Sequence, residues 1–294
     1  MLTRLRLGQL LPATLIIGVF MVLPLAMMAY VSILERAPNG GVVWGSHSTD
    51  AYVAFLFERD LFDELVLNTD YLQIFARSFW LAFLTTALAL AIGLPTALYI
   101  ALQPPVRRNI LVFLVTIPFW TNLLVRNYAW ILLLRNNGLL DNFLSSLGFG
   151  PVETGLLYTP WAVAIGLTYS FLPFMVLPIY ASLEKLDWRL VEAAYDLYAT
   201  KWQALRRVVL PLARPGLAAG AVLVFVPCLG AYVTPVLLGG GKSLMIGNLI
   251  QSQFGAARNW PFGSALAFAL LAIVLVAMLV HVTRFRRAPD GSRL

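Results

Sequence analysis

The side chains that could do covalent or metal chemistry are few and scattered in this sequence. The single cysteine, Cys228, lies in an apolar segment with no histidine near it in sequence, so we expect a buried, inert thiol rather than a nucleophile. The two histidines, His47 and His281, are far apart and lack metal-ligand spacing. No G-x-x-x-x-G-K-[ST] motif is present. We therefore predict no catalytic residues, no metal site and no cofactor bound by this chain, so that any ATP and Mg²⁺ would bind to another chain.

A second kind of chemistry, the binding of a solute in transit, is open to polar and aromatic residues in the long apolar stretches. Arg126 is the only Asp, Glu, Lys or Arg within these stretches, which are Leu7–Leu34, Ser78–Val106, Asn109–Leu134, Thr154–Leu183, Pro215–Gly241 and Asn259–Thr283. Such a charge is by default a functional candidate, although its guanidinium could also reach the membrane interface. Aromatic faces can hold an organic cation through cation–π contacts of about 0.5–2 kcal/mol each, but packing or an interfacial belt is their commoner role. The candidate translocation-path residues are Trp120, Asn122, Arg126, Tyr128, Trp130, Tyr169, Tyr232 and Thr234.

The composition indicates that lipid covers much of this chain. Of its 294 residues, 60% are hydrophobic and 12% are charged, whereas a soluble domain is about 45–50% apolar and about 25% charged. The net charge of +7 does not indicate nucleic-acid binding, because the basic residues form no single patch and no nucleic-acid motif accompanies them.

Six stretches are long and apolar enough to cross the hydrocarbon core, which takes about 20 residues of helix. The first is too long for a signal-peptide core and has no evident A-x-A cleavage site, so we expect a retained helix. We predict one transmembrane domain over 1–294, all-α and polytopic, with spans at approximately 10–33, 74–102, 110–134, 158–183, 214–237 and 261–283.

The distribution of Lys and Arg predicts that both termini are cytoplasmic. With that orientation, the inner segments hold about two thirds of the Lys and Arg residues but only about a third of the Asp and Glu residues, as the positive-inside rule expects. The inner segments are then the N-terminus, Arg107–Arg108, the loop 184–214 and the C-terminus from Arg284.

The predicted outer loop, 35–73, begins with a Gly/Pro/Asn/Ser-rich part and continues into an amphipathic stretch. Its apolar residues recur at helical spacing between charged ones, which predicts a helix. That helix could lie on lipid or form part of a docking surface for a soluble partner. The apolar residues are Phe55, Leu56, Leu61, Phe62, Leu65 and Val66.

The predicted inner loop, 184–214, has the pattern of two short helices rather than of a linker, because apolar residues recur in it at three-to-four spacing. Thr200 and Gln203 form the capping-box pattern at the start of the second helix. Pro211 and Pro215 should break or bend the entry into the fifth span. The density of exposed aromatic and aliphatic residues favours an interaction site over a solvated hairpin.

The same loop resembles the EAA loop of ABC importer permeases, in which a short coupling helix between spans four and five sits in a cleft of a cytosolic ATPase. On this resemblance, small residues at 193 and 194 allow close approach and Glu192 reaches across the interface. The residues that match, or replace, the loop's pattern are Glu192, Ala193, Ala194, Asp196, Tyr198, Ala199, Leu210 and Pro211.

One position departs from that pattern. The family has glycine six residues after the glutamate, and here that position is Tyr198. Glycine permits a turn with positive φ, which is unusual for a bulky residue. Either the turn is made differently, around Ala199 and Thr200, or Tyr198 supplies an aromatic contact to the ATPase.

Two further signatures strengthen the resemblance and extend it over nearly the whole chain past residue 55. Together they resemble the first of the two permeases in spermidine/putrescine-type importers. They are Pro118–Arg126, and Leu237–Lys242 followed by Ile246–Ile250 and Asn259–Gly263.

The resemblance implies a non-catalytic, type I permease subunit of an ATP-driven importer in a bacterial inner membrane. Its expected partners are a second permease, two copies of an ATPase and an extracytoplasmic solute-binding protein. The expected solute is a small organic cation such as putrescine or spermidine, or alternatively an amino-acid-like or opine-like molecule. A secondary transporter is disfavoured, because neither internal repeats nor carboxylates in the spans are visible.

Overall fold

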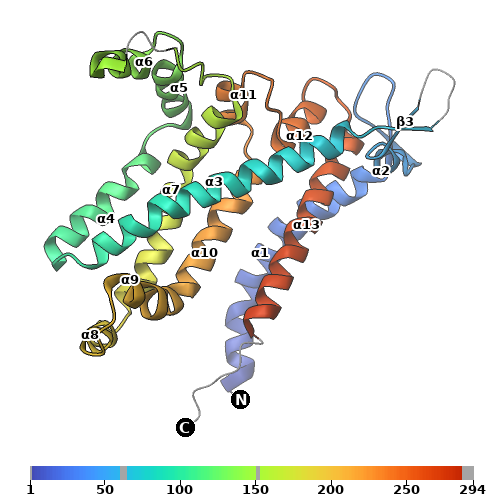
Figure 1. Cartoon of the computed structure of the whole chain (residues 1–294). Coiled ribbons are helices and arrows are strands. Elements are labelled where there is room, and N and C mark those ends of the chain that lie inside the picture. The colour runs from blue at the N-terminus through green and yellow to red at the C-terminus, as the bar shows by residue number, and fades with distance from the viewer. Residues whose placement is uncertain (1, 60–64, 150–152, 287–294) are drawn as a thin grey trace. The chain divides into compact units, whose positions relative to one another are not determined.

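The computed structural model describes residues 2–59, 65–149 and 153–286, which are mostly helical (Figure 1). The chain divides into two compact units. The first unit comprises residues 1–73 and 249–294, and the second unit comprises residues 74–248.

The second unit is a bundle of helices. Its first helix begins four residues before residue 74 and its last helix ends after residue 248, so both helices extend into the first unit. Its helices are α3 (Asp70–Ala101), α4 (Pro105–Trp120), α5 (Leu123–Leu134), α6 (Leu139–Leu144), α7 (Pro160–Glu184), α8 (Arg189–Asp196), α9 (Lys201–Ala204), α10 (Leu210–Leu229), α11 (Val233–Gly239) and α12 (Ile246–Phe254), with π-helical turns at Ser145–Phe149 and Leu205–Val209.

The core of the second unit lies where α7 packs against α3 and α10. Close approach of α10 to α7 depends on two glycines. A Cβ added to Gly216 would collide with the carbonyl oxygen of Pro178, and one added to Gly220 would lie 2.9 Å from Sδ of Met175. Small residues at such contacts let helix backbones pack tightly where no hydrophobic effect drives association.

The predicted third span, 110–134, is a pair of helices, α4 and α5, that meet at 93°. Thr121 and Asn122 between them have extended backbone conformations. The Thr121 hydroxyl donates to the carbonyl of Pro118, and the Asn122 side chain accepts from the Leu124 N–H, so the polar groups freed at the break are partly satisfied locally. Within the described ranges, five helices are long and apolar enough to cross a membrane, or up to six if this bent pair is one span.

The predicted fifth span, 214–237, is also interrupted. Helix α10 ends at Leu229, and α11 begins at Val233. Gly230 ends the first helix, and Pro235 in the first turn of α11 has no N–H to donate to Ala231, so a continuous helix would lose that bond. At the other end, Pro211 does not stop the helix: a π-helical turn joins α9 to α10.

The first unit pairs α1 (Leu2–Ser32) with α13 (Trp260–Arg286) and carries two antiparallel hairpins. Strand β1 (Leu34–Arg36) pairs with β2 (Val42–His47), and β3 (Phe57–Arg59) pairs with β4 (Leu65–Leu67); α2 (Asp50–Val53) lies between the hairpins. Arg36 ties the first hairpin to the chain before α13 by donating to the carbonyl of Ala257.

The prediction of an amphipathic helix over the stretch from Phe55 to Val66 is wrong for its described part. Residues 57–59 and 65–67 form the β3–β4 hairpin, and residues 60–64 lie outside the described residues. Short apolar segments cannot be assigned to helix or strand by periodicity alone. Here the strand pairing satisfies backbone N–H and C=O groups that a single helical turn would leave without hydrogen bonds.

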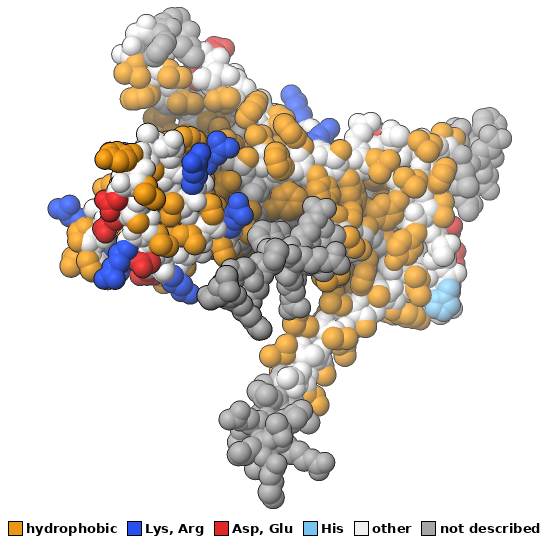
Figure 2. Space-filling view, turned by 60° about the horizontal axis from the view of Figure 1, so that its bottom comes forward, with side chains coloured by type: hydrophobic (Ala, Val, Ile, Leu, Met, Phe, Trp, Pro, Cys, Tyr) orange, Lys and Arg blue, Asp and Glu red, His pale blue; other side chains and the backbone are white. Residues whose placement is uncertain are grey.

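Two contacts in the second unit agree with the predicted grouping of loops by membrane face. Arg108, before the third predicted span, lies 3.4 Å from Glu184 after the fourth. Arg77, at the start of the second span, donates to the carbonyl of Lys242 beyond the fifth. Lys, Arg, Asp and Glu side chains gather at the end of this unit that carries α8 and α9, whereas hydrophobic side chains cover most of the other visible surface (Figure 2).

Candidate functional site

A cavity of about 380 Å³ lies in the second unit where its two helix interruptions come together. One wall comes from the α4–α5 break, a second from the α10–α11 break, and a third from α7. Irregular backbone at membrane depth is tolerated where it lines a cavity, and broken helices of this kind form solute sites in other transporters. The lining residues are Phe119, Leu123, Arg126, Leu167, Ser170, Phe171, Phe174, Gly230, Ala231, Tyr232, Val233 and Thr234.

Of the predicted translocation-path residues, three line this cavity: Arg126, Tyr232 and Thr234. Arg126 is placed one helical turn beyond the Asn122 cap of α5, and two of its guanidinium nitrogens, Nε and Nη1, are buried without a hydrogen-bond partner among the described residues. Thr234 is buried in the first turn of α11, and Tyr232 is half exposed just before it.

The other five predicted residues do not line the cavity. Trp130 and Tyr169 form an edge-to-face pair with ring centroids 5.7 Å apart, which ties α5 to α7. Trp120 and Tyr128 are largely exposed, as expected of side chains that face lipid or a partner subunit. Asn122 has a capping role at the break. Because none of these five side chains lines the cavity, their part in the path stays a prediction.

The sequence reasoning missed the phenylalanines, which dominate the apolar wall. Phe119 and Phe174 meet edge to face at 4.7 Å between centroids, and Phe171 lies 6.2 Å from Phe174. Phe119 precedes the break and the other two lie on α7 one turn apart. These residues are distant in sequence, and only the packing of α4 against α7 brings them together. A cavity walled this way can hold alkyl chains and face a cation with ring faces.

The cavity is poor in hydrogen-bonding groups and none of its lining residues is Asp or Glu. The lining residues that carry hydroxyl groups are Ser170, Tyr232 and Thr234. Among the described residues no group of three or more His, Cys, Asp and Glu side chains could hold a metal ion. The arrangement suits passage of a solute, and the described part holds no nucleophile–base pair beside the cavity.

The inner loop folds as the predicted pair of short helices. Thr200 and Gln203 form the full capping box: the Gln203 N–H donates to the Thr200 hydroxyl, and the Gln203 side chain accepts from the Thr200 N–H. On the inward side, Val191, Ala204 and Val209 are buried in the same core as α3 and α7. The loop is therefore rigidly seated on the bundle rather than attached by a flexible linker.

The turn between α8 and α9 is made at Tyr198 itself. Tyr198 has φ of +60°, its N–H donates to the Tyr195 carbonyl, and the Ala199 N–H donates to the Ala194 carbonyl. This is the Schellman arrangement, with tyrosine at the left-handed position that glycine usually occupies. The alternative of a turn around Ala199 and Thr200 is thus wrong.

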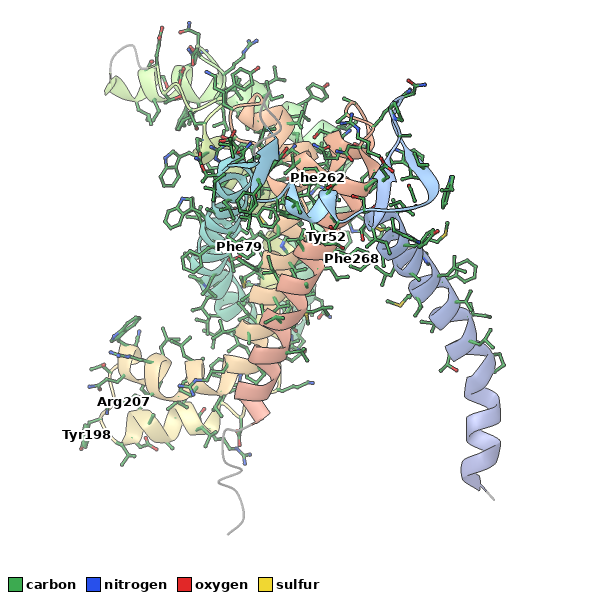
Figure 3. The ribbon with its side chains drawn as sticks, turned by 90° about the vertical axis from the view of Figure 1, so that its right-hand side faces the viewer. Tyr52, Phe79, Tyr198, Arg207, Phe262 and Phe268 are labelled. Atoms are coloured by element: carbon green, nitrogen blue, oxygen red, sulfur yellow. The ribbon has the colours of Figure 1, made fainter. Side chains whose placement is uncertain are left out.

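The outward face of the loop carries exposed acidic residues along α8 and exposed apolar residues at its tip. Glu192, Ala193 and Asp196 are exposed, whereas Ala194, Ala199, Leu210 and Pro211 are half-buried. Tyr198 is 95% exposed and Leu197 is 82% exposed, and Figure 3 shows Tyr198 at the tip, beyond Arg207. Large apolar side chains held this far into water mark an interaction surface. The other exposed apolar residues of this surface are Leu190, Tyr195 and Trp202.

Comparison with known proteins identifies the family. Residues 89–287 match the family model described as "Binding-protein-dependent transport system inner membrane component". The chain is 41% identical over 231 residues to the spermidine/putrescine transport system permease protein PotB of Escherichia coli K12, covering 79% of this chain and 84% of that protein. It is 44% identical over 217 residues to PotB of Haemophilus influenzae, covering 74% and 75%.

A solved structure shows the same fold. A chain of a bacterial alginate ABC transporter, in complex with an alginate pentasaccharide-bound periplasmic protein, superposes with a TM-score of 0.74 over 97% of this chain and 95% of that one, at 18% identity. The predicted type I importer permease fold is therefore confirmed. Taken with the family match, these findings show that the chain belongs to the binding-protein-dependent transport system inner membrane components, as a multi-pass, non-catalytic permease subunit of an ABC importer.

Proposed function

We propose that this chain forms half of the translocation pathway of an ATP-driven importer for a small organic cation, putrescine or spermidine. The observation that carries the proposal is the 41–44% identity, over three quarters of the chain, to permeases named for spermidine and putrescine transport. The aromatic wall of the cavity supports it, because protonated amines are attracted to ring faces and the methylene segments of a polyamine to apolar ones.

Membership of the family implies a second permease, an ATPase and a solute-binding protein as partners. We propose the finer composition of a permease heterodimer on two ATPase copies, which bind ATP and Mg²⁺. The tip of the α8–α9 hairpin is the site where the ATPase docks, and the hydrophobic surface of the bundle contacts lipid. Both termini and the loop 184–214 then lie in the cytoplasm of a bacterial cell.

Because ATP is hydrolysed on the ATPase and the solute passes through the permeases, this chain must convert movement at the α8–α9 hairpin into a change of shape at the cavity. The hairpin is buried into α7 and α10, and α7 and the C-terminal end of α10 both border the cavity. A force on the hairpin therefore reaches the cavity through two packed helices, with the breaks at Gly230 and Thr121 as the points that can bend.

The test is uptake of radiolabelled putrescine by proteoliposomes that contain the complete importer. We expect uptake to require both ATP hydrolysis and the solute-binding protein. Uptake driven by an ion gradient without ATP would contradict the importer mechanism. Failure of the solute-binding protein to bind polyamines in calorimetry, with binding of an amino acid or opine instead, would contradict the choice of solute while leaving the mechanism standing.

A further inference from the structure

The guanidinium of Arg126 is the one cation among the residues lining the cavity of the second unit. Its Nε and Nη1 atoms are buried, and the described residues offer them no hydrogen-bond partner. The residue as a whole is partly buried. A charge whose donor groups are withdrawn from water in a membrane protein is ordinarily paired or placed against a polar path.

In the described part of the chain, no lining residue of the cavity offers a carboxylate to balance this charge. The predicted spans contain no Asp or Glu, and none lines the cavity. Asp141, which follows α5 in sequence, already has other partners. Its carboxylate accepts hydrogen bonds from the Asn137 N–H and from both the N–H and the hydroxyl of Thr154.

The helix backbone near Arg126 also favours a negative charge at this position. Arg126 lies in the first turns of α5, a helix of 12 residues that begins directly at the break. The N-terminal end of a helix carries a positive potential, which reinforces the guanidinium rather than opposing it. The planar fork of a guanidinium matches a carboxylate with two parallel hydrogen bonds.

We propose that Arg126 receives a carboxylate from outside this chain, and that the carboxylate is an Asp or Glu side chain of the second permease subunit. The inference rests on the proposed function, because a polyamine cargo has no carboxylate of its own. Membership of the family implies that such a subunit is present, and Arg126 is only partly buried, so its guanidinium can be reached from outside this chain.

The pairing has a consequence for the cargo. Unpaired, Arg126 would repel a polycation from the cavity walled by Phe119, Phe171 and Phe174. Paired, its charge is neutralised and the ring faces become available to the cation. Assembly of the two permeases thereby prepares the cavity for its cargo, and any movement that separates the pair raises the electrostatic cost of cation occupancy.

The experiment uses the complete importer, purified through a tag on this chain, and measures how much second permease is retained per inserted copy of the tagged chain. The variants are Arg126→Lys, Arg126→Gln and Arg126→Glu. The matched control is Arg135→Gln, which changes an exposed arginine at the C-terminal end of the same helix. This readout does not depend on transport, so a failure of the polyamine assignment leaves it intact.

We expect retention close to wild type for Arg126→Lys and for Arg135→Gln. Retention should fall roughly tenfold or more for Arg126→Gln and further for Arg126→Glu, because losing one member of a partly buried charged pair leaves the other uncompensated. Changing the acidic residues in the spans of the second permease to Arg, one at a time, should restore retention with Arg126→Glu at one position, which identifies the carboxylate.

Two outcomes overturn the proposal. If all three Arg126 variants retain the second permease fully but raise the KM for solute uptake, with the neutral and acidic variants affected most, the carboxylate belongs to the solute. If Arg126→Gln and Arg126→Glu retain both assembly and uptake, the side chain has no functional counter-ion.

Discussion

The guanidinium of Arg108 lies 3.4 Å from the carboxylate of Glu184, a contact that joins the start of α4 to the end of α7. Both side chains are partly exposed, so the ion pair adds little stability. Its value is topological, because two charged groups in contact lie on one face of a membrane. At the other end of the second unit, the Arg77 side chain donates to the backbone carbonyl of Lys242, which likewise places these two positions on one face.

These contacts sharpen a prediction of topology. In a Cys228→Ser background, Thr200→Cys and Glu184→Cys should be labelled by a membrane-impermeant thiol reagent only after the cells are opened. Lys242→Cys should be labelled in intact cells. The background is suitable because Cys228 is buried. Labelling of position 200 from outside intact cells would refute the proposed orientation.

A second prediction concerns coupling to the ATPase. Glu192 is exposed and makes no side-chain hydrogen bond or ion pair among the described residues, so Glu192→Ala should leave insertion and stability unchanged. Loss of an interface anchor costs about 2 kcal/mol or more, and about 2.8 kcal/mol weakens docking about a hundredfold. Uptake and ATPase stimulation by the loaded solute-binding protein should therefore be lost.

Charge introduced beside Glu192 should have the same effect, and the structure selects the position. Ala194→Asp is expected to abolish uptake, but Ala194 packs against the core, so that variant also tests packing. Ala193 is exposed, which makes Ala193→Asp the cleaner change. Lys185→Ala, at the C-cap of α7, is the control. Full stimulation and uptake in both Glu192→Ala and Ala193→Asp would contradict a coupling role for this hairpin.

A third prediction separates the backbone of Tyr198 from its ring. A left-handed conformation costs a non-glycine residue about 1–2 kcal/mol, and glycine gives back part of this through its greater freedom in the unfolded chain. Tyr198→Gly should therefore raise the thermal midpoint of the subunit slightly. Tyr198→Ala keeps the strained backbone without the ring and should not raise it.

If the exposed ring contacts the ATPase, both Tyr198 variants should reduce ATPase co-purification to a similar extent. Insertion should be normal in both. Normal co-purification in both variants would show that the ring contributes nothing to docking, whereas loss of insertion in Tyr198→Gly would contradict the role assigned to the backbone at this turn.

A fourth prediction concerns pH. The hydrogen bond from the Thr154 hydroxyl, aided by two backbone N–H groups and opposed by burial, holds the pKa of Asp141 below its ordinary value of 3.8. Because the folded pKa is the lower one, the stability from this group is fully present above about pH 3.8 and is lost as the pH falls through the lowered value. Between pH 5 and pH 8 it should therefore contribute no pH dependence.

Asp141→Asn should remove this contribution at every pH and loosen the segment between Asn137 and Thr154. Faster cleavage of this segment in limited proteolysis at pH 7 is the measurement. Thr154→Ser, which keeps the hydroxyl, should resist cleavage like the wild type. Equal protection in Asp141→Asn would show that the carboxylate is not what fixes the segment.

The sequence by itself determined the class of protein and the local devices. Hydrophobic length and low charge established a multi-pass membrane protein, because the bilayer core imposes one length on every span. The pattern from Thr200 to Gln203 determined a capping box, which depends only on residues three apart. The family could be recognised because the Glu192 loop and each of the other matching blocks is a continuous run of residues in the sequence.

Only the tertiary structure decided what non-local packing controls. It broke two apparently continuous spans at Thr121–Asn122 and Gly230–Tyr232 and set these breaks against α7, with Phe171 and Phe174 in the wall. It also put the turn at Tyr198, where burial of the flanking helices outweighs the strain of one residue. Apolar periodicity carries no information about which breaks meet, because that depends on helix crossing and side-chain fit between segments about a hundred residues apart.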